Sequence, residues 1–345
     1  MSNSVFIKNL YTKCRIHGTG EAQVAISDSE IYALINLALH DLNWSFDELG
    51  IEQTSLPSLN YYEINLDWFE YLETDIASEN ILSVLSACFN KDPDFALFID
   101  NLCALHRRRI KFKRILSNQP IPTMEQIGPR ILLEYGACDI ELLANWMTWR
   151  KWIYDIDNRS AQETGYLFEP ILASSLGGET VGARNSPIKR IDENGNSTNN
   201  GRQVDCLIAD TNTAYELKLR VTIAASGQGR FGEELSFPVE CQAAGYTPVL
   251  LVLDPTPSNR LAELSEKYIE CGGFLFQGEQ AWEHMEQQAG NVMSIFIENY
   301  IKPAIKLVDN LEIQSPQKIS LEWYGDSIII SNGSANYNIP RQNGV

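Results

Sequence analysis

The stretch RQVDCLIADTNTAYELKLRV, residues 202–221, contains two runs of alternating apolar residues on either side of the turn-forming segment Asp210–Thr213. This pattern predicts a β-hairpin. Side chains alternate faces along a strand, so Glu216 and Lys218 on the second strand point the same way. In a hairpin with this turn, Asp205 on the first strand lies across from them. The stretch therefore predicts two carboxylates and one ammonium group on a single face.

These three charges allow two interpretations. Two carboxylates a few ångström apart repel each other unless a proton or a cation lies between them. Mg²⁺ favours one or two carboxylates together with waters and phosphate oxygens, and an ammonium group beside it can orient or deprotonate a water for attack on a phosphodiester. In the other interpretation, the residues form only a charged strand face or a cross-strand ion pair.

The segments around the hairpin alternate between helices and strands. Before it, AQETGYLFEPILASSLGG (161–178) predicts a helix with a bend or a break at Pro170, and the polar stretch RIDENGNSTNNG predicts a loop. After it, GEELSFPVECQAAG predicts a helix and TPVLLVLD a buried strand. The pattern then predicts a helix over 259–273, a strand over 274–277 and a long helix over 279–307.

The first half of the chain has the pattern of helices. SDSEIYALINLALHDL (27–42) places apolar residues at helical spacing after a cap formed by Ser27 with Glu30. Similar patterns continue to about residue 157, where Trp146, Trp149 and Trp152 recur at three-residue steps that predict core packing. In the tail, KISLEW and DSIIIS predict strands, and the last few residues have no pattern. The predicted organisation is a helical region over 1–158, a core over 159–310 and a β-rich tail over 311–345.

The order of Asp205, a short loop and Glu216-Leu217-Lys218 resembles the PD-(D/E)XK nuclease motif, although Val204 stands where the motif has proline. The resemblance implies an α/β (α+β) fold, a mixed β-sheet flanked by helices. It also implies a further acidic metal ligand on the helix before the hairpin, for which Glu169 is the first candidate and Glu163 the second.

A longer segment, ELKLRVTIAASGQGRFGEELSFP followed by GYTPVLLVLDPT, is similar to the ApaLI-type restriction endonucleases. This resemblance covers most of the second half of the chain. It implies a homodimeric type II enzyme that cuts both strands of double-stranded DNA at a short palindrome, GTGCAC in the prototype, and leaves 5′-phosphate and 3′-hydroxyl ends. A cognate DNA methyltransferase is expected as a genomic neighbour.

The resemblance also implies roles for individual residues. Asp205, Glu216 and Glu169 bind Mg²⁺, with Mn²⁺ as a substitute, and Lys218 positions or activates the attacking water.

The net charge of −18 argues against coating of nucleic acid by bulk attraction, but it does not exclude a local basic cleft. The candidate DNA contacts are Arg107, Arg108, Arg109, Lys111, Lys113, Arg184, Asn185, Lys189, Arg190, Arg202, Gln228 and Arg230.

Composition also restricts the location of the protein. The chain has no apolar run long enough to span a bilayer and no signal segment at its start. Its seven cysteines form no C-x-x-C pair, which favours reduced thiols over a disulfide framework or a zinc ribbon. We therefore expect a soluble cytoplasmic protein without membrane contacts.

The sequence also allows two alternatives. The stretch GQGRFG, with Gly227, Gly229 and Gly232, matches the G-x-G-x-x-G pattern of a Rossmann-type dinucleotide-binding enzyme. The first strand of such a fold is buried on both faces, whereas the strand here carries Glu216 and Lys218. The second alternative is a DNA-binding protein with the nuclease fold but without activity, which the intact charged residues argue against.

Overall fold

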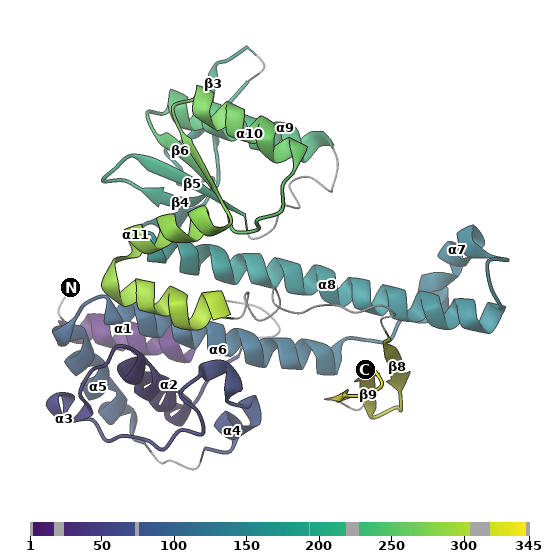
Figure 1. Cartoon of the computed structure of the whole chain (residues 1–345), viewed down its shortest axis with the longest axis horizontal. Coiled ribbons are helices and arrows are strands. Elements are labelled where there is room, and N and C mark those ends of the chain that lie inside the picture. The colour runs from purple at the N-terminus through teal and green to yellow at the C-terminus, as the bar shows by residue number, and fades with distance from the viewer. Residues whose placement is uncertain are drawn as a thin grey trace. The chain divides into compact units, whose positions relative to one another are not determined.

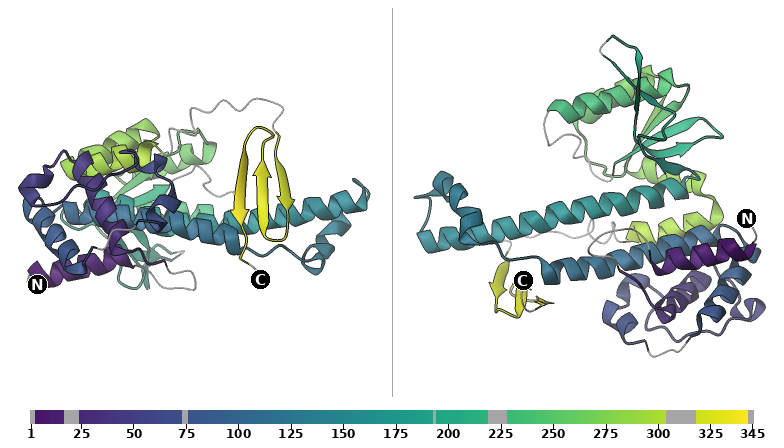
Figure 2. Two further views of the ribbon diagram at one scale, coloured as in Figure 1. Left: turned by 90° about the horizontal axis from the view of Figure 1, so that it is seen from below. Right: turned by 180° about the vertical axis from the view of Figure 1, so that it is seen from behind.

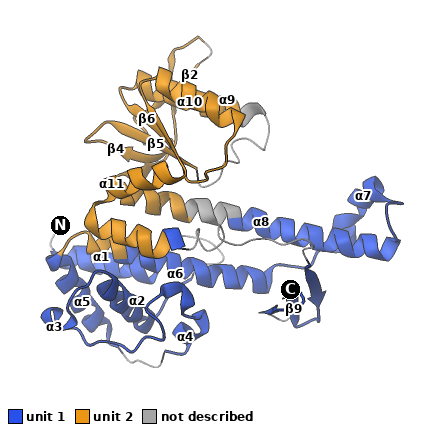
Figure 3. Cartoon of the chain, in the orientation of Figure 1, with its two compact units in different colours: residues 1–91, 99–165, 302–345 blue, residues 92–98, 166–301 orange. Residues whose placement is uncertain are grey.

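The structure is a computed structural model of the chain, and it describes residues 3–16, 24–72, 76–192, 194–218, 228–303 and 318–342 (Figure 1, Figure 2). The chain divides into two compact units (Figure 3). Residues 1–91, 99–165 and 302–345 form the first, here called the helical unit, and residues 92–98 and 166–301 form the second, the sheet unit. Across the described ranges, no helix combines the length and the apolar character needed to cross a membrane.

The helical unit begins with the helices that the apolar spacing predicts. The cap of α2 is confirmed, because Ser27 Oγ accepts a hydrogen bond from Glu30 N at 3.1 Å and Glu30 Oε2 accepts one from Ser27 N at 2.5 Å. Helices α6 and α8 continue into the sheet unit. The helices in chain order are α1 (Asn3–Arg15), α2 (Asp28–Asp41), α3 (Phe46–Leu49), the 3₁₀ helix η1 (Tyr61–Glu63), α4 (Leu66–Glu70), α5 (Ser78–Lys91), α6 (Phe95–Asn118), α7 (Met124–Glu134) and α8 (Ile140–Ser175).

Helix α8 differs from the sequence-based prediction. It runs as one helix for 36 residues with Pro170 inside it, so of the bend or break predicted at this proline the break is wrong. Proline removes one backbone hydrogen bond, but Ile171 and Leu172, which follow it, are almost completely buried and hold this turn in place. In this part of the chain, the division between the two units falls inside α8, between residues 165 and 166.

The C-terminal tail forms an antiparallel sheet within the helical unit (Figure 2). Its strands are β8 (Ser320–Trp323), β9 (Ser327–Ser331) and β10 (Asn336–Pro340), in the order β10-β9-β8. The first two strands were predicted, whereas β10 was not, because its residues Asn-Tyr-Asn lack apolar alternation. Ile328 and Ile339 of this sheet pack against Trp152 of α8.

The sheet unit is built on a mixed five-stranded sheet in the order β1-β4-β5-β6-β7. The first three strands pair antiparallel and the last three pair parallel, which confirms the predicted mixed sheet flanked by helices. The polar stretch predicted as a loop instead forms a small hairpin of β2 and β3. The strands are β1 (Glu179–Val181), β2 (Lys189–Ile191), β3 (Ser197–Gly201), β4 (Val204–Ile208), β5 (Thr213–Lys218), β6 (Thr247–Val252) and β7 (Phe274–Gln277).

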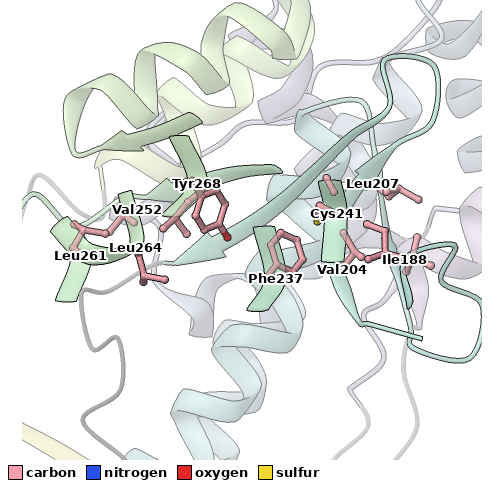
Figure 4. Close-up of a cluster of buried hydrophobic side chains, with 12 residues drawn as sticks. Ile188, Val204, Leu207, Phe237, Cys241, Val252, Leu261, Leu264 and Tyr268 are labelled. Atoms are coloured by element: carbon pink, nitrogen blue, oxygen red, sulfur yellow. The ribbon is translucent and has the colours of Figure 1, made fainter. Parts of the chain in front are cut away.

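The crossover helices α9 (Gln228–Ala243) and α10 (Asn259–Glu270) pack against one face of this sheet. Phe237, Leu264 and Tyr268 from these helices bury the core together with Val204 and Val252 from the strands (Figure 4). The predicted helix over 279–307 begins as α11 (Glu279–Phe296) but is interrupted at Gly290, whose φ of 68° breaks the helical path. It continues as the π-helix η2 (Ile297–Ile301).

Candidate active site

The β4–β5 hairpin brings the predicted acidic residues face to face. Leu207 pairs with Ala214 and Cys206 with Tyr215, so the next pair in the same register is Asp205 with Glu216. Asn212, with a φ of 49°, supplies the left-handed residue of the turn. The hairpin predicted from the alternating pattern is therefore confirmed, with the register that places both carboxylates on one face.

The polar contacts of this face join the strands. Asp205 Oδ2 accepts a hydrogen bond from the backbone N–H of Leu217 at 3.0 Å, and Lys218 Nζ lies 2.7 Å from Glu216 Oε1. Asp205 and Glu216 are only 8% and 9% exposed, so both carboxylates are almost completely removed from water. Buried charges of this kind require a partner.

The electrostatics of the buried carboxylates show an excess of negative charge. Burial raises the pKa of Asp205 well above its usual value, and the nearby charges of Glu216 and Glu169 raise it further. Burial and the charge of Glu216 also raise the pKa of Glu169, which reaches the cluster from α8. The carboxylates of the cluster therefore repel one another, and an additional cation would relieve that repulsion.

A fourth carboxylate, which the sequence-based prediction missed, completes the cluster. Glu234 of α9 places its Oε1 3.0 Å from Lys218 Nζ, so the ammonium group lies between Glu216 and Glu234. Burial disfavours the charge on Lys218, but these two carboxylates outweigh that effect and raise its pKa above the usual value. A signal was present in the sequence, because Glu234 precedes the buried Phe237 and Cys241 by three and seven residues, on the face of α9 that packs on the sheet.

The side chains present suit a divalent metal ion that keeps several waters. Among the described residues, no group of three or more His, Cys, Asp and Glu side chains forms a ready cage for a metal. One oxygen of Glu216 is instead held by Lys218, and one of Asp205 by Leu217. Mg²⁺ needs only one or two carboxylates besides water and substrate oxygens, which Asp205 and Glu216 can supply.

Comparison with known proteins identifies relatives of this chain. The model of the ApaLI-like restriction endonuclease family matches residues 52–302, which include the hairpin, α8 and α9. The chain is also 45% identical over 303 residues to the Type II restriction enzyme ApaLI of Acetobacter pasteurianus, over 85% of this chain and 80% of that protein. The chain belongs to the ApaLI-like restriction endonuclease family. No solved structure matches it.

Membership of the ApaLI-like family confirms the resemblance drawn from residues 216–238 and 245–256 and disagrees with the dinucleotide-binding alternative. Two structural features oppose that alternative as well. Strand β5 pairs antiparallel with β4, and Gly229 and Gly232 lie inside helix α9 rather than in a phosphate-binding loop. Gly227 lies outside the described residues.

For this ApaLI-like chain, the structure corrects part of the predicted DNA contact surface. Arg107 is 6% exposed and donates to the carbonyl of Cys14, so it cannot contact DNA without rearrangement of the fold. Arg108 and Arg109 donate to backbone carbonyls within the helical unit, and Lys113 lies 2.5 Å from Asp67. Burial therefore argues against a DNA contact for Arg107, whereas Arg108, Arg109, Lys111 and Lys113 are partly exposed and stay predictions.

The candidates close to the hairpin also differ in availability. Arg202 is 7% exposed and pairs with Glu240 at 3.5 Å, so its assignment to DNA is wrong. Lys189 donates to the carbonyl of Ser186, and Arg190 pairs with Glu233. Arg184 and Asn185 are exposed and stay candidates for DNA contact. The side chains of Glu163, Gln228 and Arg230 lie outside the described part of the chain.

Proposed function

We propose that the protein is a Mg²⁺-dependent type II restriction endonuclease that hydrolyses phosphodiesters of double-stranded DNA and leaves 5′-phosphate and 3′-hydroxyl ends. The observation that carries this proposal is the cluster of Asp205, Glu216 and Lys218 on one buried face of the hairpin. Family membership supports the same reaction class. The cytoplasm, where Mg²⁺ and DNA are both present, is the proposed location.

Asp205 and Glu216 would hold the metal ion, with Glu169 as an additional carboxylate. When bound, Mg²⁺ supplies positive charge that polarises the scissile phosphate and lowers the pKa of a water. Asp205 and Glu216, both almost completely buried on the hairpin, would fix the position of this charge, and the half-buried Glu169 would add to it. Mn²⁺ prefers similar oxygen ligands and is expected to substitute.

Lys218 acts as a cation in this proposal. Its raised pKa keeps it protonated at neutral pH, so it orients the attacking water and offsets the charge that develops on the phosphate. Removal of a proton from the water by Lys218 is disfavoured for the same reason. Of the two roles that the sequence left open, positioning and activation, the contacts favour positioning.

Cleavage of both strands requires two such sites. The described residues contain one cluster of this kind, and the strands of a DNA duplex are antiparallel, so we propose that two copies act together as a homodimer. GTGCAC, the site of the family prototype, is the first sequence to test. A DNA methyltransferase with the same specificity is proposed as a genomic neighbour, because host DNA must be protected from the enzyme.

The proposal is tested by incubating the purified protein with unmethylated phage DNA and Mg²⁺. We expect discrete bands, and we expect a GTGCAC duplex to be cut while a duplex with a permuted site stays intact. Intact DNA at every salt concentration tried, with both Mg²⁺ and Mn²⁺, would contradict an active nuclease. Tight binding to DNA without cleavage would instead identify a silent DNA-binding protein with the nuclease fold.

Glu234 provides a further prediction, since its carboxylate is the second partner of Lys218. Glu234→Gln keeps the shape of the side chain but removes the charge that holds the ammonium group. The amide oxygen of glutamine still accepts the hydrogen bond of Lys218, but the contact loses its ionic character and weakens by about 1 kcal/mol, so we expect single-turnover cleavage to slow by roughly 3- to 10-fold. DNA affinity, measured with Ca²⁺ in place of Mg²⁺, should change little.

The matched control is Glu233→Gln, the neighbouring acid on α9, which pairs with Arg190 at the surface instead. We expect this variant to cleave at nearly the wild-type rate. Equal rates for the Glu234 variant and the wild type would show that Lys218 does not depend on Glu234.

A further inference from the structure

Residues 124–154, here called the arm, consist of helix α7 and the first part of helix α8 (Figure 1). The two helices share a small core in which Ile127, Leu143 and Met147 are buried and Ile131 is partly buried. All of the arm belongs to the helical unit. A core of this size covers only a minor part of the apolar surface that these helices carry.

The arm exposes an unusual amount of apolar surface. Nine of the 21 large hydrophobic side chains that are exposed among the described residues lie within its 31 positions. Leu132 is 81% exposed, Leu133 88% and Tyr135 75%. Single exposed hydrophobic residues are ordinary, but a concentration of this kind marks an interaction surface.

Helix α8 carries part of this surface as a regular stripe. Leu142, Trp146, Trp149 and Ile153 follow one another at steps of four, three and four residues. Leu142, Trp146 and Ile153 are 59%, 54% and 47% exposed. Trp149 is partly buried, because it packs against the cluster that Trp152 forms with Ile328 and Ile339 of the C-terminal sheet. The aromatic spacing was predicted to mean core packing, which holds for Trp152 and is wrong for Trp146. Steps of three and four residues are the spacing with which one helix packs along another.

Charge argues against DNA as the occupant of this surface. From residue 124 to 156 the sequence contains five acidic residues and three basic ones. Two of the basic residues are already paired, Arg150 with Glu134 at 2.5 Å and Lys151 with Asp155 at 2.6 Å. Contact with a phosphate backbone requires several available cations, whereas Arg130 is the one basic residue of this segment for which no ion pair is described.

The size of the apolar surface fits a second copy of the chain. Nine side chains exposed to between 47% and 88% offer roughly 1,000 Å² in total, and a standard interface buries about 800 Å² on each partner. A twofold contact uses the same patch on both copies, so each arm would cover the other. The described residues hold one catalytic cluster, so two copies would also supply one cluster for each of the two antiparallel strands.

We propose that the arm is the surface through which two copies of this chain associate, with the stripe on α8 packing against its counterpart. This inference deepens the proposed function and rests on it, because the proposed cleavage of two strands is what calls for two active sites. The dimer forms without DNA or metal, because the contact is apolar and lies within the helical unit.

The test is sedimentation of the full-length protein, without DNA or metal, from 0.1 to 50 µM. Trp146→Glu on α8 and Leu133→Glu on α7 change exposed side chains, so both variants are expected to fold with the circular dichroism of the wild type. We expect each to weaken dimerisation at least tenfold. Tyr71→Glu, at a side chain that is 79% exposed outside the arm, is the matched control and should leave the dimer intact.

Three outcomes would overturn the proposal: a wild type that stays monomeric at 50 µM, dimers of unchanged strength in both arm variants, or dissociation caused equally by the Tyr71 control. None of these results depends on catalysis. A failure of the proposed nuclease function would appear separately, as intact DNA in the cleavage assay with a dimer that still forms.

Discussion

Lys218→Ala is expected to slow DNA cleavage by about 10²- to 10³-fold, the usual cost of removing one positioned electrostatic group from an active site. The ammonium group of Lys218 lies between Glu216 and Glu234 at 2.7 and 3.0 Å, so alanine leaves these two carboxylates without a shared cation. Single-turnover cleavage of a cognate duplex measures the effect. DNA affinity in Ca²⁺ should stay within about threefold of the wild type, because the loss affects the transition state more than binding.

The matched control is Lys267→Ala on α10, a surface lysine in the same unit that pairs only with Glu270 among the contacts described for it. This variant should cleave as the wild type does. If Lys218→Ala cleaved DNA at more than about a tenth of the wild-type rate, Lys218 would have no part in transition-state stabilisation of the expected size.

Asp205→Asn is expected to abolish cleavage and, at neutral pH, to stabilise the metal-free protein. The asparagine keeps an oxygen that can accept the hydrogen bond of Leu217 N–H, but it removes a buried charge that Glu216 and Glu169 repel. Burial and the neighbouring carboxylates raise the pKa of Asp205, so its ionisation near neutral pH costs folding free energy that asparagine avoids, and we expect the free energy of unfolding to increase. Urea unfolding at pH 7.5 with EDTA measures the gain.

The pH dependence of this effect has a definite sign. Folding raises the pKa of Asp205, so the unfolded chain releases the proton at lower pH than the folded protein does. The contribution of protonated Asp205 to the free energy of unfolding is complete below the pKa that this group has in the unfolded chain, near 4. It is lost as the pH rises through the higher pKa that the group has in the folded protein. The difference in unfolding free energy between the variant and the wild type should therefore grow with rising pH and then level off.

A divalent cation should reverse the ranking of the two proteins. Mg²⁺ or Ca²⁺ stabilises the folded wild type by binding to it, whereas the variant lacks one of the proposed ligands and should gain little. Asp210→Asn, at an exposed acid in the turn of the same hairpin, serves as the control and should match the wild type in both conditions. Equal stabilisation of all three proteins by the cation would remove Asp205 from the metal site.

The sequence by itself determined the hairpin and its charged face. The period of two residues along a strand and the turn between the runs fix which side chains share a face, so the opposition of Asp205 and Glu216 followed from local rules. The main helices and the order of the crossover elements were also readable, because apolar residues recur at helical spacing where one face is buried.

The tertiary structure alone decided the contacts between elements that are distant along the chain. Glu234 meets Lys218 only because α9 packs back onto the sheet after the crossover, and no local pattern gives that distance. Arg107 and Arg202 have the same charge in the sequence as any DNA-binding arginine, but the folded chain buries both. Continuity of α8 through Pro170 likewise depends on the burial of the residues that follow it. Local patterns specify which face of an element is apolar or charged, whereas its partner depends on how the whole chain packs.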